Sequence, residues 1–174
     1  TKKLTTLDGR ETAPLEVKAD HFQDKKGNPL TFFEAVVGGK SVGVPGTPAL
    51  LEKAHQKWGK KKWVELFKDA IQLAEKGFPV SQKLSSSIKK NHKSLKKYKT
   101  TQNYFLPLGK GLEYGNIKTN ADYANTLKLF SKYGSDVFYS GTIGEDIIST
   151  VRNVKVNPGK LSKIDLLNYE VKER

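Results

Sequence analysis

Arg10 is the residue of this sequence that is best suited to recognise an anion. It lies in the segment DGRETAP, residues 8–14, directly after a short stretch that predicts a strand. Arginine is scarce here, since Arg10, Arg152 and Arg174 are the only arginines of the chain. A guanidinium can hold a carboxylate or a phosphate with two parallel N–H donors. From the residues alone, Arg10 is either such an anion clamp or one half of a surface ion pair with a neighbouring acid.

Other residue patterns do not predict a catalytic or metal site. The histidines, His21, His55 and His92, are scattered and have no acidic companion at the spacing of metal ligands. Cysteine is absent, which excludes disulfide frameworks, zinc ribbons and thiol nucleophiles. The glycine-rich segment 38–46 lacks the pattern of a phosphate-binding loop and is more typical of a turn that leads into a helix. We therefore expect no catalytic residue, no metal ion and no cofactor in this chain.

The sequence is strongly basic, with 31 Lys and Arg against 18 Asp and Glu and a formal net charge of +13. Nucleic acid is the first partner that such a charge indicates. The basic residues are mostly lysines dispersed along the chain, however, and lysine lacks the fork geometry that favours phosphate and base recognition. A hydrated, lysine-rich surface is the better interpretation. No apolar run approaches the roughly 18 residues that a membrane span needs.

Residues 47–77 predict the two best helices. Threonine followed by proline is typical of a helix start, and it opens the first helix over residues 47–58. Apolar residues then recur at helical spacing over residues 63–74, which predicts an amphipathic second helix. A glycine follows each run. We expect an antiparallel hairpin with both tryptophans near its turn, and we expect it to be the best-packed part of the chain.

The remaining elements are expected to be shorter. The sequence predicts a strand over residues 3–8, a short helix over 15–22, a weakly packed surface helix over 81–99, a strand or extended loop over 104–108, a helix over 121–133, a helix from Thr142 to Val151 that starts with a capping box to Glu145, and a last helix from Ser162. The chain is therefore expected to be rich in helices, with a few short strands.

The segment around Arg10 resembles the Arg-Glu-x-Ala-Pro motif in the large subunit of gamma-glutamyltranspeptidases. Four further elements follow in the family's order. The segment 43–47 (GVPGT) is similar to Gly-x-Pro-Gly-Thr, residues 57–78 are similar to the helical region after it, residues 138–141 (FYSG) are similar to Phe-Tyr-x-Gly, and residues 165–169 (DLLNY) are similar to Asp-Leu-x-x-Tyr. Because the elements span the chain, the resemblance covers nearly all of it.

The sequence departs from the family pattern in two places. Gly9 stands where family members carry a side chain before the arginine, and Lys68-Asp69 precede Ala70 where a proline is common. Nothing resembles the Thr-Thr-His segment that carries the family's nucleophile, or the early Gly-Gly-Asn-Ala-Val-Asp-Ala region. We therefore expect residues 1–174 to be one region from the middle of a large subunit, with no internal boundary, and we expect Thr1 not to act as a nucleophile.

The resemblance implies an α+β fold in which this chain is a helix-rich piece of the αββα arrangement of N-terminal nucleophile hydrolases. It implies cleavage of the γ-glutamyl amide of glutathione or another γ-glutamyl compound, with transfer of the acyl group to water or to an amino acid. Arg10 would bind the α-carboxylate of the donor. The threonine nucleophile would lie on the small subunit, so this chain alone is expected to be inactive.

The same resemblance implies the partners and the location. The partners would be the small subunit of the same precursor and the rest of the large subunit, with no nucleic acid and no membrane span. Family members are periplasmic, secreted or surface-anchored, so a periplasmic or secreted protein is expected. The alternative function is a non-catalytic, basic helical module that binds nucleic acid or an acidic surface.

Overall fold

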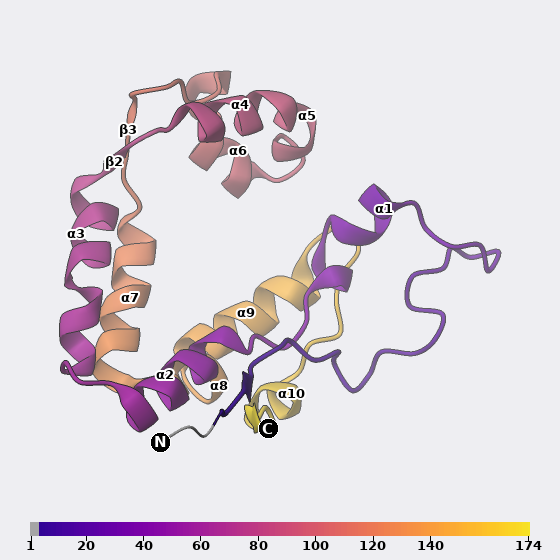
Figure 1. Ribbon diagram of the computed structural model, residues 1–174. Helices are drawn as coiled ribbons and strands as arrows, with labels where there is room; N and C mark the ends of the chain where they lie inside the picture. Colours follow the sequence, from indigo (N-terminus) through magenta and orange to yellow (C-terminus); the bar gives the residue numbers. More distant parts are fainter. Residues whose placement is uncertain (1–3) are drawn as a thin grey trace. The chain divides into compact units, whose positions relative to one another are not determined.

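The computed structural model describes residues 4–174, and contacts group the chain into two units (Figure 1). The first unit contains the described residues up to Leu66 together with Leu129–Arg174, and the second contains Phe67–Lys128. The chain therefore leaves the first unit, forms the second and returns. That residues 1–174 form one region of a larger subunit stays a prediction.

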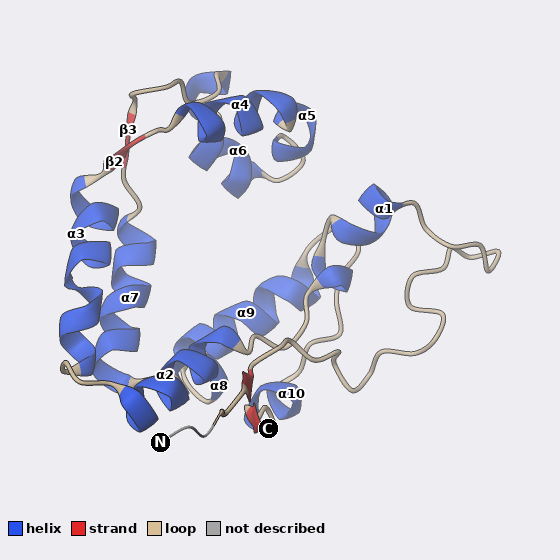
Figure 2. Ribbon diagram, viewed as in Figure 1, coloured by secondary structure: helices blue, strands red, loops and turns tan. Residues whose placement is uncertain are grey.

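Helices dominate the first unit, and its strands are only two residues long (Figure 2). Its helical elements are α1 (Phe32–Val36), a 3₁₀ turn at Gly39–Ser41, α2 (Thr47–Trp58), a 3₁₀ turn that begins at Trp63, the end of α7 (Ala121–Tyr133), α8 (Asp136–Tyr139), α9 (Thr142–Asn153) and α10 (Lys163–Leu167). Strand β1 (Leu7–Asp8) pairs antiparallel with β4 (Lys172–Glu173), so that Leu7 lies opposite Glu173. This pairing brings residues from both ends of the described chain together.

The core of the first unit consists of apolar side chains from three separate stretches of sequence. Val44, Val151, Leu161 and Leu166 are buried against one another, and Tyr139 and Tyr169 pack against them. Leu161 and Leu166 are among the most deeply buried side chains described. Because such burial contributes about 1.5–3 kcal/mol per large aliphatic side chain, this cluster anchors the segments that surround it.

The second unit has its own core. Its elements are α3 (Lys68–Lys76), β2 (Phe78–Pro79), α4 (Gln82–Lys90), α5 (His92–Leu95), α6 (Lys99–Phe105), a 3₁₀ turn at Pro107–Gly109, β3 (Ile117–Lys118) and the first part of α7. Strands β2 and β3 are antiparallel partners. Helix α3 lies beside α7 (Figure 1), where Glu75 and Lys128 form an ion pair. The buried side chains Val80, Ile88, Leu106 and Leu112 form the core.

The prediction for residues 47–77 was wrong in two respects. Helices α2 and α3 belong to different units, and α3 packs beside α7. Residues 47–77 are also not the best-packed part of the described chain. The most deeply buried large side chains lie outside this range, and Trp58 is 54% exposed. An amphipathic stripe indicates that a helix face is suited to burial, but it does not specify the partner.

Four further predictions were corrected locally. Residues 15–22 form turns rather than a helix, residues 81–99 supply core side chains such as Ile88, and residues 104–105 end helix α6. Helix α9 begins at Thr142 with Gly141 as its N-cap, so the expected capping box of Thr142 is not formed. The helix expected from Ser162 is confirmed, since Ser162 caps α10. The predicted strand is confirmed at Leu7–Asp8, and its residue 3 lies outside the described residues.

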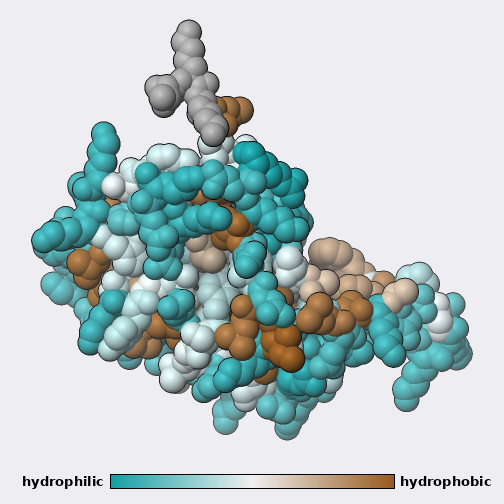
Figure 3. Space-filling model, turned by 90° about the horizontal axis from the view of Figure 1, so that it is seen from below, coloured by the Kyte–Doolittle hydropathy of each residue, from teal (hydrophilic) through white to brown (hydrophobic). Residues whose placement is uncertain are grey.

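Apolar side chains interrupt the hydrophilic surface of the described residues (Figure 3). The exposed ones in the first unit include Leu15, Phe22, Phe32, Phe33, Leu51, Trp58 and Leu167. Adjacent exposed apolar side chains, such as Phe32 and Phe33 in α1, are typical of surface that another polypeptide covers. In residues 4–174 no helix is both long enough and apolar enough to cross a membrane.

Two neighbouring leucines of α10 provide a matched test of this packing. Leu166 is 1% exposed and Leu167 is 53% exposed, so these consecutive residues of α10 differ in burial but not in chemistry. Leu166→Ala should lower the free energy of unfolding by about 2–5 kcal/mol. Leu167→Ala should lower it by less than about 1 kcal/mol, because little apolar surface is lost from the interior. Urea titration of both variants checks the prediction, and equal losses would contradict it.

Candidate functional site

Arg10 lies two residues after β1, at the point where the two ends of the first unit meet. Its backbone N–H donates a hydrogen bond to the Asp8 carboxylate over 3.1 Å. The same carboxylate accepts a hydrogen bond from the Arg174 guanidinium over 2.8 Å. Asp8 therefore connects the backbone of Arg10 to the residue that follows β4. The acid that pairs with the Arg10 side chain is Glu11, not Asp8.

The guanidinium of Arg10 faces solvent. Its side chain is 81% exposed, and Arg10 Nη2 lies 3.4 Å from Oε1 of Glu11, whose side chain is 60% exposed. An exposed pair of this kind contributes about 0–1 kcal/mol, so an anionic ligand can displace it at little cost. The surface ion pair expected from the sequence is present, and the same geometry leaves the guanidinium accessible to a ligand.

Tyr169 reaches Arg10 from the other end of the unit. Its hydroxyl donates a hydrogen bond of 2.9 Å to the Arg10 carbonyl oxygen. Burial raises the pKa of Tyr169, and the nearby Asp8 and Glu11 carboxylates raise it further. The phenol therefore keeps its proton at neutral pH, which it must do to act as a donor to a carbonyl.

Tyr139 supports Tyr169 from α8. The two rings are stacked, with centroids 5.6 Å apart and planes only 8° from parallel. The Tyr139 hydroxyl donates to the Pro45 carbonyl over 2.6 Å and accepts from the Ala49 N–H over 3.3 Å. Burial raises the pKa of Tyr139 to about 12, so this hydroxyl also stays protonated. The stacked pair joins the Arg10 backbone to the start of α2.

Two glycines permit the close approach of these segments. A Cβ on Gly46 would lie 2.1 Å from the Tyr169 hydroxyl and 2.1 Å from the Gly9 carbonyl oxygen, so any side chain there would separate them. A Cβ on Gly9 would lie 2.5 Å from Cβ of Leu50 in α2. Glycine at position 9, which the resemblance indicated as a departure from the family pattern, thus fits a backbone that leaves no room for a side chain.

The structure thus brings together four of the elements on which the resemblance was based. Arg10, Gly46, Tyr139 and Tyr169 come from segments separated by up to about 160 residues. Tyr169 connects them, because its hydroxyl donates to the Arg10 carbonyl and lies against Gly46 while its ring stacks on Tyr139. The sequence singled out Arg10 as the candidate binding residue but gave no role to the two tyrosines. Both tyrosines lie in segments that resemble family motifs, residues 138–141 and 165–169, but a motif does not show what a hydroxyl contacts.

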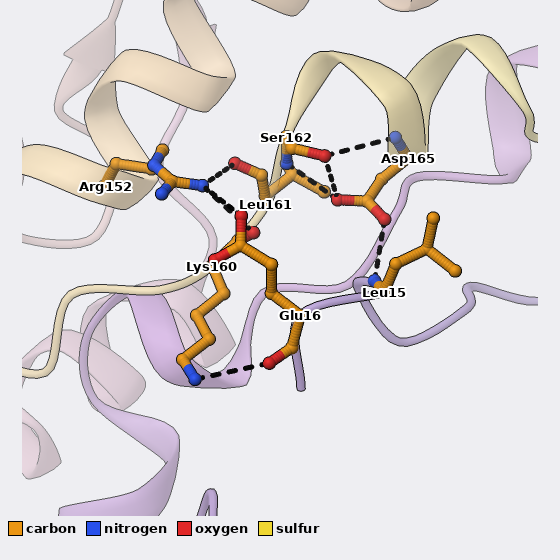
Figure 4. A network of polar contacts seen from close by, with 7 residues as sticks. All are labelled: Leu15, Glu16, Arg152, Lys160, Leu161, Ser162 and Asp165. Atoms are coloured by element: carbon orange, nitrogen blue, oxygen red, sulfur yellow. Dashed lines mark hydrogen bonds and ion pairs between the residues drawn. The ribbon is translucent and has the colours of Figure 1, made fainter. Parts of the chain in front are cut away.

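The segment that follows Arg10 is fastened to α10 by a polar network (Figure 4). The buried Asp165 carboxylate accepts hydrogen bonds from the Leu15 N–H over 2.7 Å and from both the N–H and the hydroxyl of Ser162. Arg152 of α9 contacts the Glu16 carboxylate and the Lys160 and Leu161 carbonyls, each over 3.3 Å. This network fixes the chain five residues after Arg10.

A pocket of about 260 Å³ lies beside Glu11. It is lined by Glu11, Thr12, Ala13, Pro14, Val17, His21, Phe22, Lys40, Ser41, Val42 and Gly43. His21 and Lys40 hold its wall together, because Nε2 of His21 lies 2.9 Å from the Lys40 carbonyl and the Lys40 ammonium donates to the His21 carbonyl over 3.0 Å. A carbonyl only accepts, so Nε2 of His21 carries a proton and does not serve as a metal ligand.

The other two histidines do not line this pocket. His55 contacts the Lys61 carbonyl, and His92 belongs to α5 in the second unit. Within residues 4–174, no three His, Asp or Glu side chains come together in an arrangement that could hold a metal ion. The candidate site remains the surface around the exposed guanidinium of Arg10.

Comparison with known proteins identifies the class of protein. The gamma-glutamyltranspeptidase family model matches residues 1–174, and the chain therefore belongs to the gamma-glutamyltranspeptidase family. The glutathione hydrolase proenzyme of Bacillus subtilis (strain 168) is 37% identical over 171 residues, which are 98% of this chain and 28% of that protein. The glutathione hydrolase proenzyme of Escherichia coli (strain K12) is 31% identical over 171 residues, which are 98% of this chain and 29% of that protein.

Solved structures agree with this assignment. The gamma-glutamyltranspeptidase of Helicobacter pylori is 35% identical with a TM-score of 0.88, and the match covers 97% of this chain and 47% of that one. The Pseudomonas nitroreducens enzyme, solved with L-DON, is 30% identical with a TM-score of 0.85 and coverages of 97% and 48%. A cephalosporin acylase from Bacillus halodurans shares the fold with a TM-score of 0.79 at 23% identity, over 99% of this chain and 32% of that one.

This chain spans less than a third of the length of the curated relatives named above. It is thus a helix-rich segment that matches part of the gamma-glutamyltranspeptidase structures. The family assignment stated from the sequence is confirmed over the whole chain.

The Asp165 network predicts a pH-dependent stability. Burial alone would raise the pKa of Asp165, but hydrogen bonds from the Ser162 hydroxyl and from the Leu15 and Ser162 amides lower it below its ordinary value of 3.8. A lowered folded-state pKa stabilises the fold above the unfolded-state pKa, and this contribution is lost as the pH falls through the folded-state value. Asp165→Asn should cost about 1.5–3 kcal/mol at neutral pH, and the deficit should shrink below pH 3.8.

Glu16→Gln is the control for this prediction, because Glu16 belongs to the same network but its side chain is 53% exposed. It should change the free energy of unfolding by about 1 kcal/mol or less. Urea titrations at neutral and acidic pH measure both variants. A deficit for Asp165→Asn that is unchanged at low pH would show that the carboxylate charge does not contribute.

Proposed function

We propose that this chain is the large-subunit portion of a gamma-glutamyltranspeptidase that cleaves the γ-glutamyl amide of glutathione and transfers the acyl group to water or an amino acid. The observation that carries the proposal is the exposed guanidinium of Arg10, set on an anchored backbone within the segment that resembles the family's Arg-Glu-x-Ala-Pro motif. The family match over the whole chain supports the same proposal. It favours an enzyme segment over a basic module that binds nucleic acid.

In this proposal Arg10 binds the α-carboxylate of the γ-glutamyl donor. The guanidinium presents parallel N–H donors that match the two carboxylate oxygens. The donor carboxylate would replace Glu11 as the ion-pair partner, and Glu11 would then pair elsewhere rather than contact the substrate. Arg10 therefore contributes to substrate binding, and bond cleavage is left to other residues.

The nucleophile is proposed to be the N-terminal threonine of the small subunit of the same precursor. The α-amine of such a threonine can accept its hydroxyl proton and pass it to the departing amine, so that the γ-glutamyl C–N bond breaks as the acyl-enzyme ester forms. Water or an amino acid then takes the acyl group, and the threonine hydroxyl regains its proton. This chain would contribute mainly outer helices to the αββα fold. The exposed apolar side chains of the first unit are suited to contact the small subunit or the rest of the large subunit.

The location proposed for the enzyme is the periplasm or the extracellular space, which rests on the family resemblance. The net charge of +13 and the absence of cysteine are compatible with it. The donor is proposed to be glutathione or a related γ-glutamyl compound, in line with the curated relatives, which are named glutathione hydrolase proenzymes.

Arg10→Ala tests the binding role in the complete proenzyme that contains this chain. The variant should raise the KM for a γ-glutamyl anilide roughly ten- to two-hundredfold, since a hydrogen bond to a charged group contributes about 1.5–3 kcal/mol. Maturation of the precursor should stay intact. Arg10→Lys should recover only part of the loss, because an ammonium retains the charge but not the two-pronged geometry.

The control substrate is the 4-aminobutyryl anilide, which lacks the α-carboxylate. Its kcat/KM should hardly respond to Arg10→Ala, because it offers no anion for the guanidinium to bind. Equal losses for both donors would show that Arg10 supports the fold and not the substrate, and the proposed role would be wrong.

The chain of 174 residues by itself should not turn over a γ-glutamyl anilide. The proposal places the nucleophile and the oxyanion-stabilising groups elsewhere in the precursor, and without them the transition state is not stabilised. Release of the aniline is followed by absorbance with the purified chain, and the mature proenzyme is the positive control. Turnover by the chain alone would contradict the proposal.

A further inference from the structure

The backbone of Arg10 is held much more firmly than its side chain. Its N–H donates to Asp8, and its carbonyl accepts the hydrogen bond from Tyr169. By contrast, the guanidinium is 81% exposed, with the exposed Glu11 carboxylate as its ion-pair partner among the described residues. The place from which the side chain extends is therefore set by Asp8 and Tyr169.

Tyr169 is itself fixed by the core of the first unit. Its N–H donates to the carbonyl of Leu166 over 3.1 Å, and Leu166 is only 1% exposed. Its ring is stacked on Tyr139. The phenol hydroxyl thus extends from a buried anchor to the edge of the site, where it contacts the residue proposed to bind substrate.

Contacts near the start of α2 also restrict the position of Tyr169. Tyr139 contacts Pro45 and Ala49 at the start of α2, and Gly46 leaves just enough room for the Tyr169 hydroxyl. The hydroxyl lies close to both Gly46 and the Arg10 carbonyl, so a shift of either segment would disturb the hydrogen bond. The segments that carry Gly46 and Arg10 therefore both determine the position of the Tyr169 hydroxyl.

We infer that Tyr169 is a positioning residue for Arg10: its hydroxyl, held in place by the ring of Tyr139, fixes the Arg10 backbone so that the guanidinium is presented to the donor carboxylate. This inference rests on the proposed function of Arg10. Two-pronged binding of a carboxylate depends on the direction of approach as well as on charge, since both N–H donors must align with both oxygens. Preorganisation of this kind lowers the cost of ordering a long, exposed side chain upon binding.

Tyr169→Phe isolates the hydrogen bond, because phenylalanine keeps the ring that stacks on Tyr139. In the complete proenzyme, this variant should raise the KM for a γ-glutamyl anilide about two- to tenfold, as expected for the loss of one neutral hydrogen bond, and leave kcat unchanged. The kcat/KM for the 4-aminobutyryl anilide should be unaffected. In the Arg10→Ala background, Tyr169→Phe should have no further effect on KM.

Tyr114→Phe is the matched control, because it makes the same chemical change at a tyrosine that is 71% exposed in the second unit. It should leave both donors unaffected. If Tyr169→Phe lowers kcat, impairs maturation or affects both donors equally, the hydroxyl has only a structural role and the inference is wrong. An unchanged KM would also overturn it.

The two proposals fail in different ways. If Arg10→Ala does not discriminate between the two donors, the proposed role of Arg10 is wrong, and the inference on Tyr169 falls with it. If Arg10→Ala discriminates but Tyr169→Phe does not, Arg10 binds the carboxylate without help from the tyrosine, and the inference alone is wrong.

Discussion

The antiparallel pairing of β1 with β4 is the constraint on which the first unit depends. It closes a loop that contains almost the entire chain, from Leu7 to Glu173, with two short strands. Two residues per strand supply little stability by themselves. The buried cluster around Leu161 and Leu166 lies just before β4 in the sequence, so that hydrophobic packing holds the strand in place.

This closure determines where the candidate site forms. Arg10 follows β1 by two residues and Tyr169 precedes β4 by three, so the pairing brings the Arg10 carbonyl oxygen within reach of the Tyr169 hydroxyl, which donates a hydrogen bond to it. The Arg10 backbone is therefore anchored to the core of the first unit through Tyr169, while its guanidinium is exposed. Such a division would suit ligand binding, because a side chain that extends from an anchored backbone could exchange Glu11 for an anion without a change in the core.

The sequence was most informative where a local pattern reports a local interaction. Ser162 at the start of α10 caps its helix, because capping depends on residues within one turn. It was least informative about which helices pack together. The stripe over residues 63–74 was recognised, but the partner of α3 is α7, which begins more than 40 residues later. The core role of Ile88 was also missed, since lysines and serines surround it in the sequence.

By itself, the sequence determined the family, because motifs in the family's order can be recognised without knowing what they contact. It also identified Arg10 as the candidate for binding an anion. Only the tertiary structure decided how these motifs act together. The hydroxyls of Tyr139 and Tyr169, the space left by Gly46 and the lack of room at Gly9 depend on segments that are remote along the chain. These contacts depend on the distances between atoms of remote segments, and a sequence pattern does not contain such distances.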